Sequence, residues 1–249
     1  ARQGVVAAIL DGGEDTWINF YTVDGTLIAE NQTRIDEPGY PMDLAISPDG
    51  LVIMVAYQYV DGSQTTGYVA FYNFGTAGQN QIDNIVSGYT YENTVVPEVR
   101  YLDSTTAVAF RDNGFSIYEG KQVPKEVKKV EVESEIISTF YDDKHVGLVF
   151  KDSGETDENG EVRKYRMEVY DLKGKRLVEK FFNISYSNIS MSDGTIIMYN
   201  AAQVCILNDR GRIRYNGSIM EGNVKNILKL GWNRYLLVLD SGVHVMKLS

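Results

Sequence analysis

The densest group of potential metal ligands lies in residues 151–161, with the sequence KDSGETDENGE. Calcium prefers carboxylate and amide oxygens as ligands in proteins. The calcium candidates in this run are Asp152, Glu155, Asp157 and Asn159. An EF-hand loop that begins at Glu155 would need a closing glutamate where Arg166 stands. The pattern therefore favours a solvated loop between strands, with calcium binding as the alternative.

Histidine and cysteine are too scarce to build a zinc site. The chain has two histidines, His145 and His244, and one cysteine, Cys205. No Cys-x-x-Cys or His-x-His spacing occurs, so the sequence predicts no bound metal of this kind and no other cofactor. Cys205 lies in the apolar run AAQVCILND, which is typical of a small buried side chain rather than of a reactive thiol.

Motifs for catalysis are missing from the sequence. It contains no G-x-S-x-G nucleophile turn, no G-x-G-x-x-G fingerprint and no phosphate-binding loop. Asp142 and Asp143 are adjacent, so on a strand their side chains point to opposite faces and cannot act on one substrate. We therefore predict no catalytic residues, which favours a protein that is not an enzyme.

Tyrosine is the most unusual feature of the composition, with 17 residues. Two interpretations stay open. Exposed tyrosines at the rim of a domain could stack on sugars or anchor a protein partner, whereas tyrosine is also a common strand residue. The tyrosines considered for a binding surface are Tyr57, Tyr59, Tyr89 and Tyr91.

The elements that must position these residues are short strands in a repeated unit. In each unit an apolar strand leads through a polar turn into a second strand, as in NFYTVDGTLIAEN, MEVYDLKGKRLVEK and VCILNDRGRIRYN. Earlier apolar runs bring most units to four strands, and the unit recurs about every 37 to 52 residues. Unbroken runs of Val, Ile and Ala predict strands that are buried on both faces. The sequence therefore predicts an all-β fold, a β-propeller of four-stranded antiparallel blades.

The repeat predicts about six blades in one domain that spans residues 1–249. The predicted blades are residues 1–36, 41–88, 95–133, 135–184, 186–222 and 224–249. The first and the last have three strands rather than four. The expectation is therefore an arc, or a truncated part, of a ring of about seven or eight blades.

Local motifs predict how the strands are joined and protected. The SPDG sequence at residues 47–50 predicts a type I turn. The Asp-Gly pairs that begin at Asp24, Asp61 and Asp193 predict hairpins. Val alternates with Lys and Glu in residues 125–133, which predicts an outermost strand whose charges block pairing with another sheet.

Charge excludes one class of partner. Lys and Arg number 24 against 34 Asp and Glu, a net charge of -10, which repels phosphate backbones and anionic membrane surfaces. Nucleic acid is therefore not expected as a partner. No apolar run approaches the roughly 18 residues of a membrane span, and the first residues lack a signal-peptide pattern.

The order of motifs resembles a known family. The segments GVVAAILDGGEDTWINFYTVDG, YPMDLAISPDG, VAFYNFGTAGQNQIDNIVSG and VPEVRYLDSTTAVAFRDNGFSIYEG are similar to bacterial proteins grouped as domain of unknown function 5711. The resemblance runs over nearly the whole chain. It implies a propeller of the WD40 or PQQ type behind a membrane anchor, outside the cytoplasm of a clostridial-type Firmicutes bacterium. It brings no catalytic motif.

Two functions from different classes are compatible with these observations. The first is a non-catalytic, extracytoplasmic binding or scaffold module that holds a protein, peptide or glycan. The alternative is a propeller-type hydrolase or lactonase with a metal or carboxylate site at the central channel. The lack of catalytic spacing favours the binding module, because the enzyme rests on analogy with other propellers alone.

Overall fold

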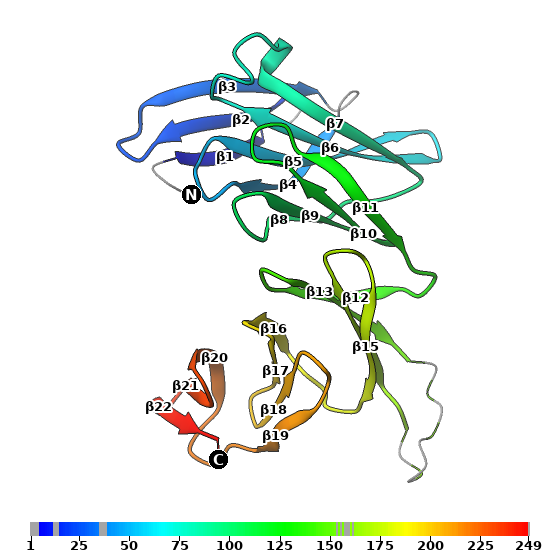
Figure 1. Cartoon of the computed structure of the whole chain (residues 1–249), viewed down its shortest axis with the longest axis vertical. Helices are drawn as coiled ribbons and strands as arrows, with labels where there is room; N and C mark the ends of the chain where they lie inside the picture. The colour runs from blue at the N-terminus through cyan, green and yellow to red at the C-terminus, as the bar shows by residue number, and fades with distance from the viewer. Residues whose placement is uncertain are drawn as a thin grey trace. The chain divides into compact units, whose positions relative to one another are not determined.

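The computed structural model describes residues 5–11, 15–34, 39–152, 154, 156, 160 and 162–248. These residues form 22 β-strands and one short 3-10 turn, η1 (Ile82–Asn84), which confirms the all-β prediction (Figure 1). In each sheet of the described chain, strands that are neighbours in sequence pair antiparallel. The chain divides into two compact units, residues 1–133 and 134–249.

The first unit holds three sheets. Their strands are β1 (Val5–Asp11), β2 (Asp15–Thr22) and β3 (Leu27–Arg34); β4 (Tyr40–Ile46), β5 (Val52–Asp61), β6 (Gln64–Asn73) and β7 (Ile85–Glu92); and β8 (Glu98–Tyr101), β9 (Thr106–Arg111), β10 (Gly114–Glu119) and β11 (Lys125–Glu131). Among the described residues, the first of these sheets has three strands, as its sequence predicts.

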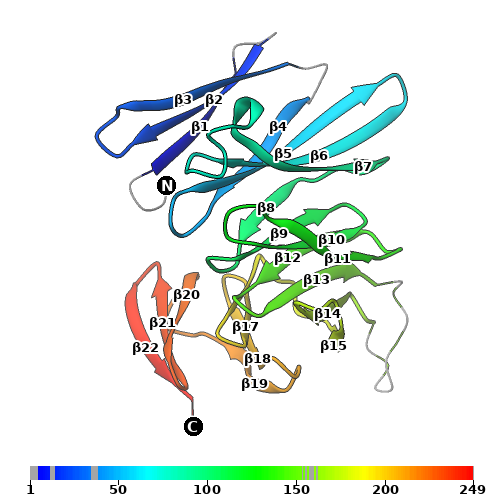
Figure 2. The same ribbon diagram turned by 45° about the horizontal axis from the view of Figure 1, so that its top comes forward.

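The second unit also holds three sheets. Their strands are β12 (Ile136–Tyr141), β13 (His145–Lys151), β14 (Tyr165–Asp171) and β15 (Arg176–Phe182); β16 (Asn188–Ser192), β17 (Thr195–Tyr199), β18 (Gln203–Asn208) and β19 (Ile213–Ser218); and β20 (Val224–Gly231), β21 (Arg234–Leu239) and β22 (Gly242–Lys247). Figure 2 shows the same meander in successive sheets. Each sheet corresponds to one predicted blade, although β7 extends past the predicted limit at 88 to Glu92.

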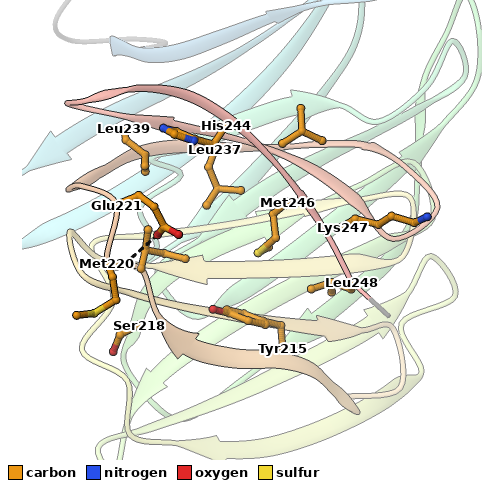
Figure 3. A pocket seen from close by; sticks show the side chains of 12 residues that line it. Tyr215, Ser218, Met220, Glu221, Leu237, Leu239, His244, Met246, Lys247 and Leu248 are labelled. Carbon is orange, nitrogen blue, oxygen red and sulfur yellow. Dashed lines mark hydrogen bonds between the residues drawn. The ribbon is translucent and has the colours of Figure 1, made fainter.

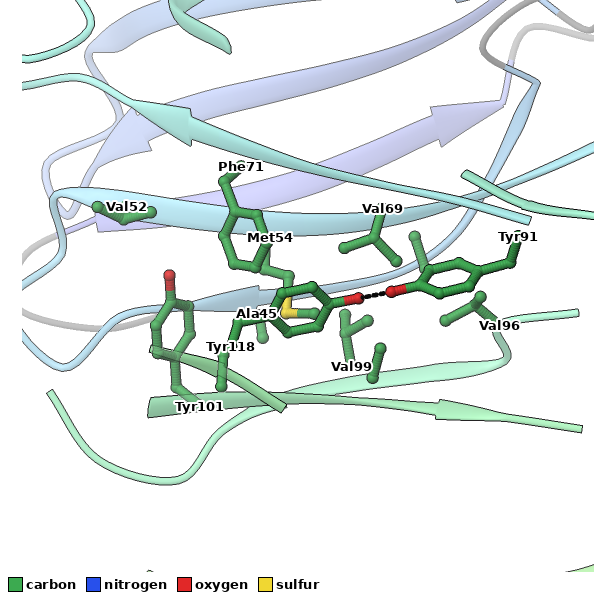
Figure 4. Packing of buried hydrophobic residues seen from close by; sticks show 13 residues of the cluster. Ala45, Val52, Met54, Val69, Phe71, Tyr91, Val96, Val99, Tyr101 and Tyr118 are labelled. Carbon is green, nitrogen blue, oxygen red and sulfur yellow. Dashed lines mark hydrogen bonds between the residues drawn. The ribbon is translucent and has the colours of Figure 1, made fainter. Parts of the chain in front are cut away.

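The sheet β4–β7 is buried on both faces, as the apolar runs predict. Alternate residues of β5 point to opposite sides. One side, with Met54, packs with Val99 and Tyr118 of the sheet β8–β11 (Figure 4). The other side, with Ile53, packs with Phe20 of β2. Because both faces are covered by apolar side chains, the strand carries a nearly continuous hydrophobic sequence.

The second unit repeats this arrangement around the sheet β16–β19. Met198 packs in one cluster with Met167 of β14, and its neighbour Ile197 packs in another with Leu237 of β21. Cys205 belongs to the first cluster and is buried, so its interpretation as a small apolar side chain is confirmed. Burial raises the pKa of the Cys205 thiol to about 11, which keeps it protonated near neutral pH.

The predicted turns form as expected. In the SPDG turn the Ser47 hydroxyl donates to the Asp49 carboxylate over 2.7 Å, and Gly50 has a φ of 76°. Asp193 and Gly194 both have positive φ, at 49° and 67°, which is the geometry of a type I′ hairpin turn.

The charged strand β11 lies at one edge of its sheet. Among the described strands it pairs with β10 alone. Most of its side chains are exposed, with Glu126 and Val130 half-buried. Lysine and glutamate side chains therefore flank the open backbone edge, which confirms the prediction of a protected outermost strand.

Candidate ligand-binding groove

The tyrosines predicted as a binding surface are mostly part of the core. Tyr57 is fully buried, and its hydroxyl lies 2.5 Å from that of Tyr72. Tyr91 is also buried and its hydroxyl hydrogen bonds with Tyr118 (Figure 4). Burial, together with Tyr72, raises the pKa of Tyr57 well above its ordinary value. The expectation of an exposed surface is wrong for Tyr57 and Tyr91, because neighbouring sheets cover both faces of their strands.

The other two tyrosines are half-buried. Tyr89 accepts a hydrogen bond from the Glu126 backbone N–H and donates one to the Pro124 carbonyl, each over 3.1 Å. Its hydroxyl therefore joins β7 to the segment that leads into β11. Tyr59 lies toward the far end of β5, beyond its buried part. These four tyrosines do not form a common exposed platform.

The calcium candidates lie mainly outside the described residues. Glu155, Asp157 and Asn159 are among the residues that the structure does not describe, and Asp152 follows the end of β13. In the described part of the chain, no three His, Cys, Asp or Glu side chains gather closely enough to hold a metal ion. Calcium binding by this loop therefore stays a prediction.

Asp142 joins two sheets. Its carboxylate accepts hydrogen bonds from the backbone N–H of His145 over 2.9 Å and from that of Gly194, in the next sheet, over 2.7 Å. The His145 Nδ1 lies 2.9 Å from the same carboxylate. The Asp142 side chain is 5% exposed, whereas that of Asp143 is 54% exposed. The two carboxylates therefore face different environments, although both lie in the turn between β12 and β13 rather than on a strand, and Asp142 is a structural residue.

A polar groove in the second unit brings together charged and aromatic side chains. Its volume is about 400 Å³. Three turns line it: the β16–β17 turn with Asp193, the β18–β19 turn with Arg210 and Arg212, and the β20–β21 turn with Trp232. Arg214 of β19 and Lys229 of β20 complete its cationic side chains. We call this hollow the arginine groove.

The β18–β19 turn holds two arginines in a fixed backbone geometry. The Asn208 side-chain oxygen accepts hydrogen bonds from the backbone N–H groups of Arg210 and Arg212, over 3.0 and 2.9 Å. Gly211 has a φ of 71° and a side chain there would meet Val178, so the turn needs glycine. Because Arg212 and Arg214 are two residues apart, both side chains reach the groove.

Trp232 is the most conspicuous side chain at the groove. It occupies a two-residue hairpin turn with Asn233, between the paired residues Gly231 and Arg234. The indole is 83% exposed, which is unusual for the largest apolar side chain. The Arg214 guanidinium lies 5.7 Å from the ring centroid and donates to Asn233 over 2.8 Å. The hairpin turn and Arg214 thus hold the indole in a solvent-exposed position.

The cationic side chains of the groove differ in whether they form ion pairs. The Lys229 ammonium donates to the Asp193 carboxylate and carbonyl, both over 2.8 Å, and is largely buried. The hydrogen bond and charge of Lys229 lower the pKa of Asp193. Arg210 and Arg212 are exposed, and among the described residues neither forms an ion pair. Their charges are therefore available to a ligand.

The groove lies in the half of the chain that lacks the acidic excess. Residues 1–133 contain 8 Lys and Arg against 19 Asp and Glu, a net charge of -11. Residues 134–249 contain 16 against 15, a net charge of +1. The overall charge of -10 therefore conceals a basic site. The sequence signals that could have shown it are the RGRIR run at residues 210–214 and the GWN turn that follows it.

A second hollow of about 380 Å³ lies between β19 and the last sheet (Figure 3). Its lining includes the large side chains of Tyr215, Leu237 and Met246. Glu221 accepts a hydrogen bond from the Met220 backbone over 3.0 Å and so stabilises its own loop. His244, the second histidine of the chain, lines this hollow rather than the arginine groove. The hollow has fewer charged groups with which to orient a ligand.

Comparison with solved structures defines the class of protein. The chain is similar to Sqt1 of Chaetomium thermophilum, solved bound to the N-terminus of ribosomal protein L10, with a TM-score of 0.59, 13% identity, and coverage of 98% of this chain and 68% of that one. It is also similar to the WD40 domain of Neurospora crassa Pan2, with a TM-score of 0.51, 12% identity, and coverage of 96% and 74%. The sheets and these likenesses make the fold a β-propeller, and each sheet a blade.

The family follows from the sequence. The model of a family of unknown function, DUF5711, matches residues 1–248, so the chain belongs to that family. No curated protein matches the chain. The described residues include no helix with the length and apolar character of a membrane span.

Proposed function

We propose that this chain is a non-catalytic binding or scaffold propeller, and that the arginine groove is its ligand site. The observation that carries the proposal is the exposed Trp232 in the same groove as Arg210 and Arg212. An exposed indole leaves a large apolar surface in water, and Trp and Arg are both enriched at binding hot spots. The ligand classes considered are a protein, a peptide and a glycan.

Binding is favoured over catalysis by what the groove contains. Its carboxylates are Asp193, which is paired with Lys229, and Asp209. Neither histidine nor cysteine lines it. The hydrolase or lactonase alternative has no specific observation in its favour within the described residues. Sqt1, bound to a ribosomal protein terminus, is an example of a propeller that serves as a binding module.

We further propose that the propeller works outside the cytoplasm, on a membrane-anchored precursor. The family resemblance supports this location. Protease treatment of intact cells should remove the domain while a cytoplasmic marker stays intact. Protection of the domain until the cells are lysed would contradict the proposed location.

An array of glycans and peptides tests the binding function. We expect the purified wild-type chain to retain ligands that the variant Trp232→Ala loses. The control is Phe181→Ala, because Phe181 is also an exposed ring beside an arginine, with Arg163 at 4.4 Å from its centroid, but lies outside the arginine groove. An array pattern that is the same for both variants and the wild type would contradict the groove as the binding site.

A further inference from the structure

We propose that the arginine groove recognises the carboxylate-bearing sugar units of an acidic glycan. This inference rests on the proposed binding function and names the ligand class for the same site. Three features of the groove lead to it: guanidinium groups without acidic partners in the described chain, an exposed indole, and carboxylates that remain within reach of a ligand.

The arginines favour a planar anion. A guanidinium group offers donors in a fixed fork that matches both oxygens of a carboxylate. The Asn208 side chain accepts from the backbone N–H groups of Arg210 and Arg212, so one ordered turn carries both arginines, and both side chains line the groove. A backbone that is ordered before binding loses less entropy when the ligand binds.

The indole favours a ligand with an apolar face. Trp232 presents a rigid, flat surface at the mouth of the groove, and Arg214 supports it from within 5.7 Å of the ring centroid. The C–H face of a sugar ring stacks on such a surface, while its hydroxyls remain free for hydrogen bonds. An ion such as phosphate would leave this surface unused.

The acidic side chains argue against a ligand of dense negative charge. Asp193 and Asp209 line the same groove as the arginines, and Asp193 is 82% exposed. They would repel a polyphosphate. A uronic acid unit carries one carboxylate among several hydroxyls, so its carboxylate can pair with an arginine while its hydroxyls donate to the aspartates. The mixed charge of the groove fits this pattern.

An acidic peptide is the competing ligand, and the position of the groove disfavours it. Extended peptides bind to sheet proteins mainly by adding a strand to an open backbone edge. The arginine groove is lined by three turns and by the ends of the strands that these turns join. The groove therefore offers few consecutive main-chain groups with which an added peptide strand could pair.

Calorimetry with the whole chain tests the inference. The probes are short oligomers of galacturonate, mannuronate and hyaluronan, the methyl ester of the galacturonate oligomer, and polyglutamate. We expect at least one uronic acid oligomer to bind, and its methyl ester to bind about tenfold more weakly or not at all. Trp232→Ala and the double variant Arg210→Glu, Arg212→Glu should each weaken binding by about tenfold or more.

The matched control is the double variant Lys173→Glu, Lys175→Glu. These lysines occupy the same kind of turn one blade earlier, where Asp171 accepts from their backbone N–H groups over 3.0 and 2.9 Å. These substitutions change the net charge by the same amount as Arg210→Glu, Arg212→Glu does. Neither lysine lines the arginine groove. We expect the affinity to change by less than about twofold. An equal loss of affinity in both double variants would show that the oligomer is attracted to positive charge in general. That result would overturn the proposed site.

The remaining outcomes separate the inference from the binding function. If polyglutamate binds in a way that depends on Trp232 and no uronic acid oligomer binds, the acidic-glycan inference is wrong. The proposal that the groove is a binding site would still hold. Equal affinity for the methyl ester would overturn the role of the carboxylate. If no probe binds and Trp232→Ala leaves the array pattern unchanged, both proposals fail. Trp232, Arg210 and Arg212 are exposed, so we expect their variants to fold, and circular dichroism of each variant checks this.

Discussion

Glu168 shows how this protein accommodates charge inside a blade. Its carboxylate is 3% exposed and hydrogen bonds with Arg166, with Tyr170 and, over 2.9 Å, with Arg176. The neighbouring carboxylate raises the pKa of Tyr170 in addition to the effect of burial, so the phenol remains a donor. A buried carboxylate needs such partners, because desolvation would otherwise favour its neutral form.

Replacing Glu168 by Gln should destabilise the chain by about 2–4 kcal/mol, since it leaves two arginines without their shared partner. Urea unfolding measures the change. Glu179→Gln is the control, because Glu179 is 36% exposed and pairs with Arg176 alone among the described ion pairs, and should cost less than about 1 kcal/mol. Similar losses for both variants would show that burial of Glu168 is unimportant.

The Cys205 thiol should be inert in the folded chain. Burial raises its pKa to about 11, above the ordinary thiol value, so the thiolate is rare at neutral pH. We expect a disulfide reagent to modify it slowly in the native protein and rapidly in denaturant. The raised pKa also means that its contribution to stability is complete below the unfolded-state pKa and is lost as pH rises toward 11. Fast labelling of native protein would contradict this.

At the residue scale, the sequence predicted buried structural side chains better than it predicted the side chains that line the arginine groove. Cys205 is buried, as its apolar neighbours predict, whereas the hydrogen bond from Gly194 to Asp142 joins two sheets and has no signal in the local sequence. The burial of Tyr57 and Tyr91 does not follow from strand patterns, because their hydroxyls are satisfied by other tyrosines: Tyr72 on the adjacent strand β6 and Tyr118 in the next sheet. Arg210 and Trp232 are 22 residues apart and line one groove only because adjacent blades bring two turns to the same hollow.

Adjacent sheets of this fold are joined by buried or half-buried aspartate side chains, one in a turn and one in a strand. Asp142, in the turn between β12 and β13, hydrogen bonds with Gly194, in the turn between β16 and β17. In the first unit, Asp43 of β4 accepts from the Val99 backbone N–H over 2.9 Å and from Arg100 over 2.5 Å. Each carboxylate thus fixes one blade to the next. Such links depend on contacts between repeats, so strand patterns predict the blades but not these contacts.

Asp142→Ala should lower the free energy of unfolding by about 2 kcal/mol, because the buried N–H groups of His145 and Gly194 lose their acceptor. Asp143→Ala is the matched control, one residue away and exposed, with an expected change below about 0.5 kcal/mol. Thermal or urea unfolding compares the two. If both variants unfold like the wild type, the link between these blades is dispensable.

The whole molecule is acidic, but unevenly so. Nineteen acidic residues against eight basic ones in residues 1–133 repel one another, while residues 134–249 are nearly balanced. A net charge taken over the full chain disfavours nucleic acid as a partner, yet it hides the cluster of arginines that lines the arginine groove. Charge counted by structural unit is the more informative quantity, and only the structure supplies the units.

Salt should therefore stabilise the chain. Raising the ionic strength from about 0.02 to 0.5 M shortens the range of repulsion among the acidic residues. We expect the melting temperature to rise by a few degrees. A fall in the melting temperature would indicate that ion pairs outweigh this repulsion.

Trp232 fluorescence tests the central claim, that the arginine groove is the ligand site. The chain has two tryptophans, so Trp17→Phe leaves Trp232 as the sole indole. Uronic acid oligomers at concentrations that saturate the chain should shift its emission to shorter wavelength and protect it from acrylamide quenching. An unchanged emission and unchanged quenching at those concentrations would contradict the account.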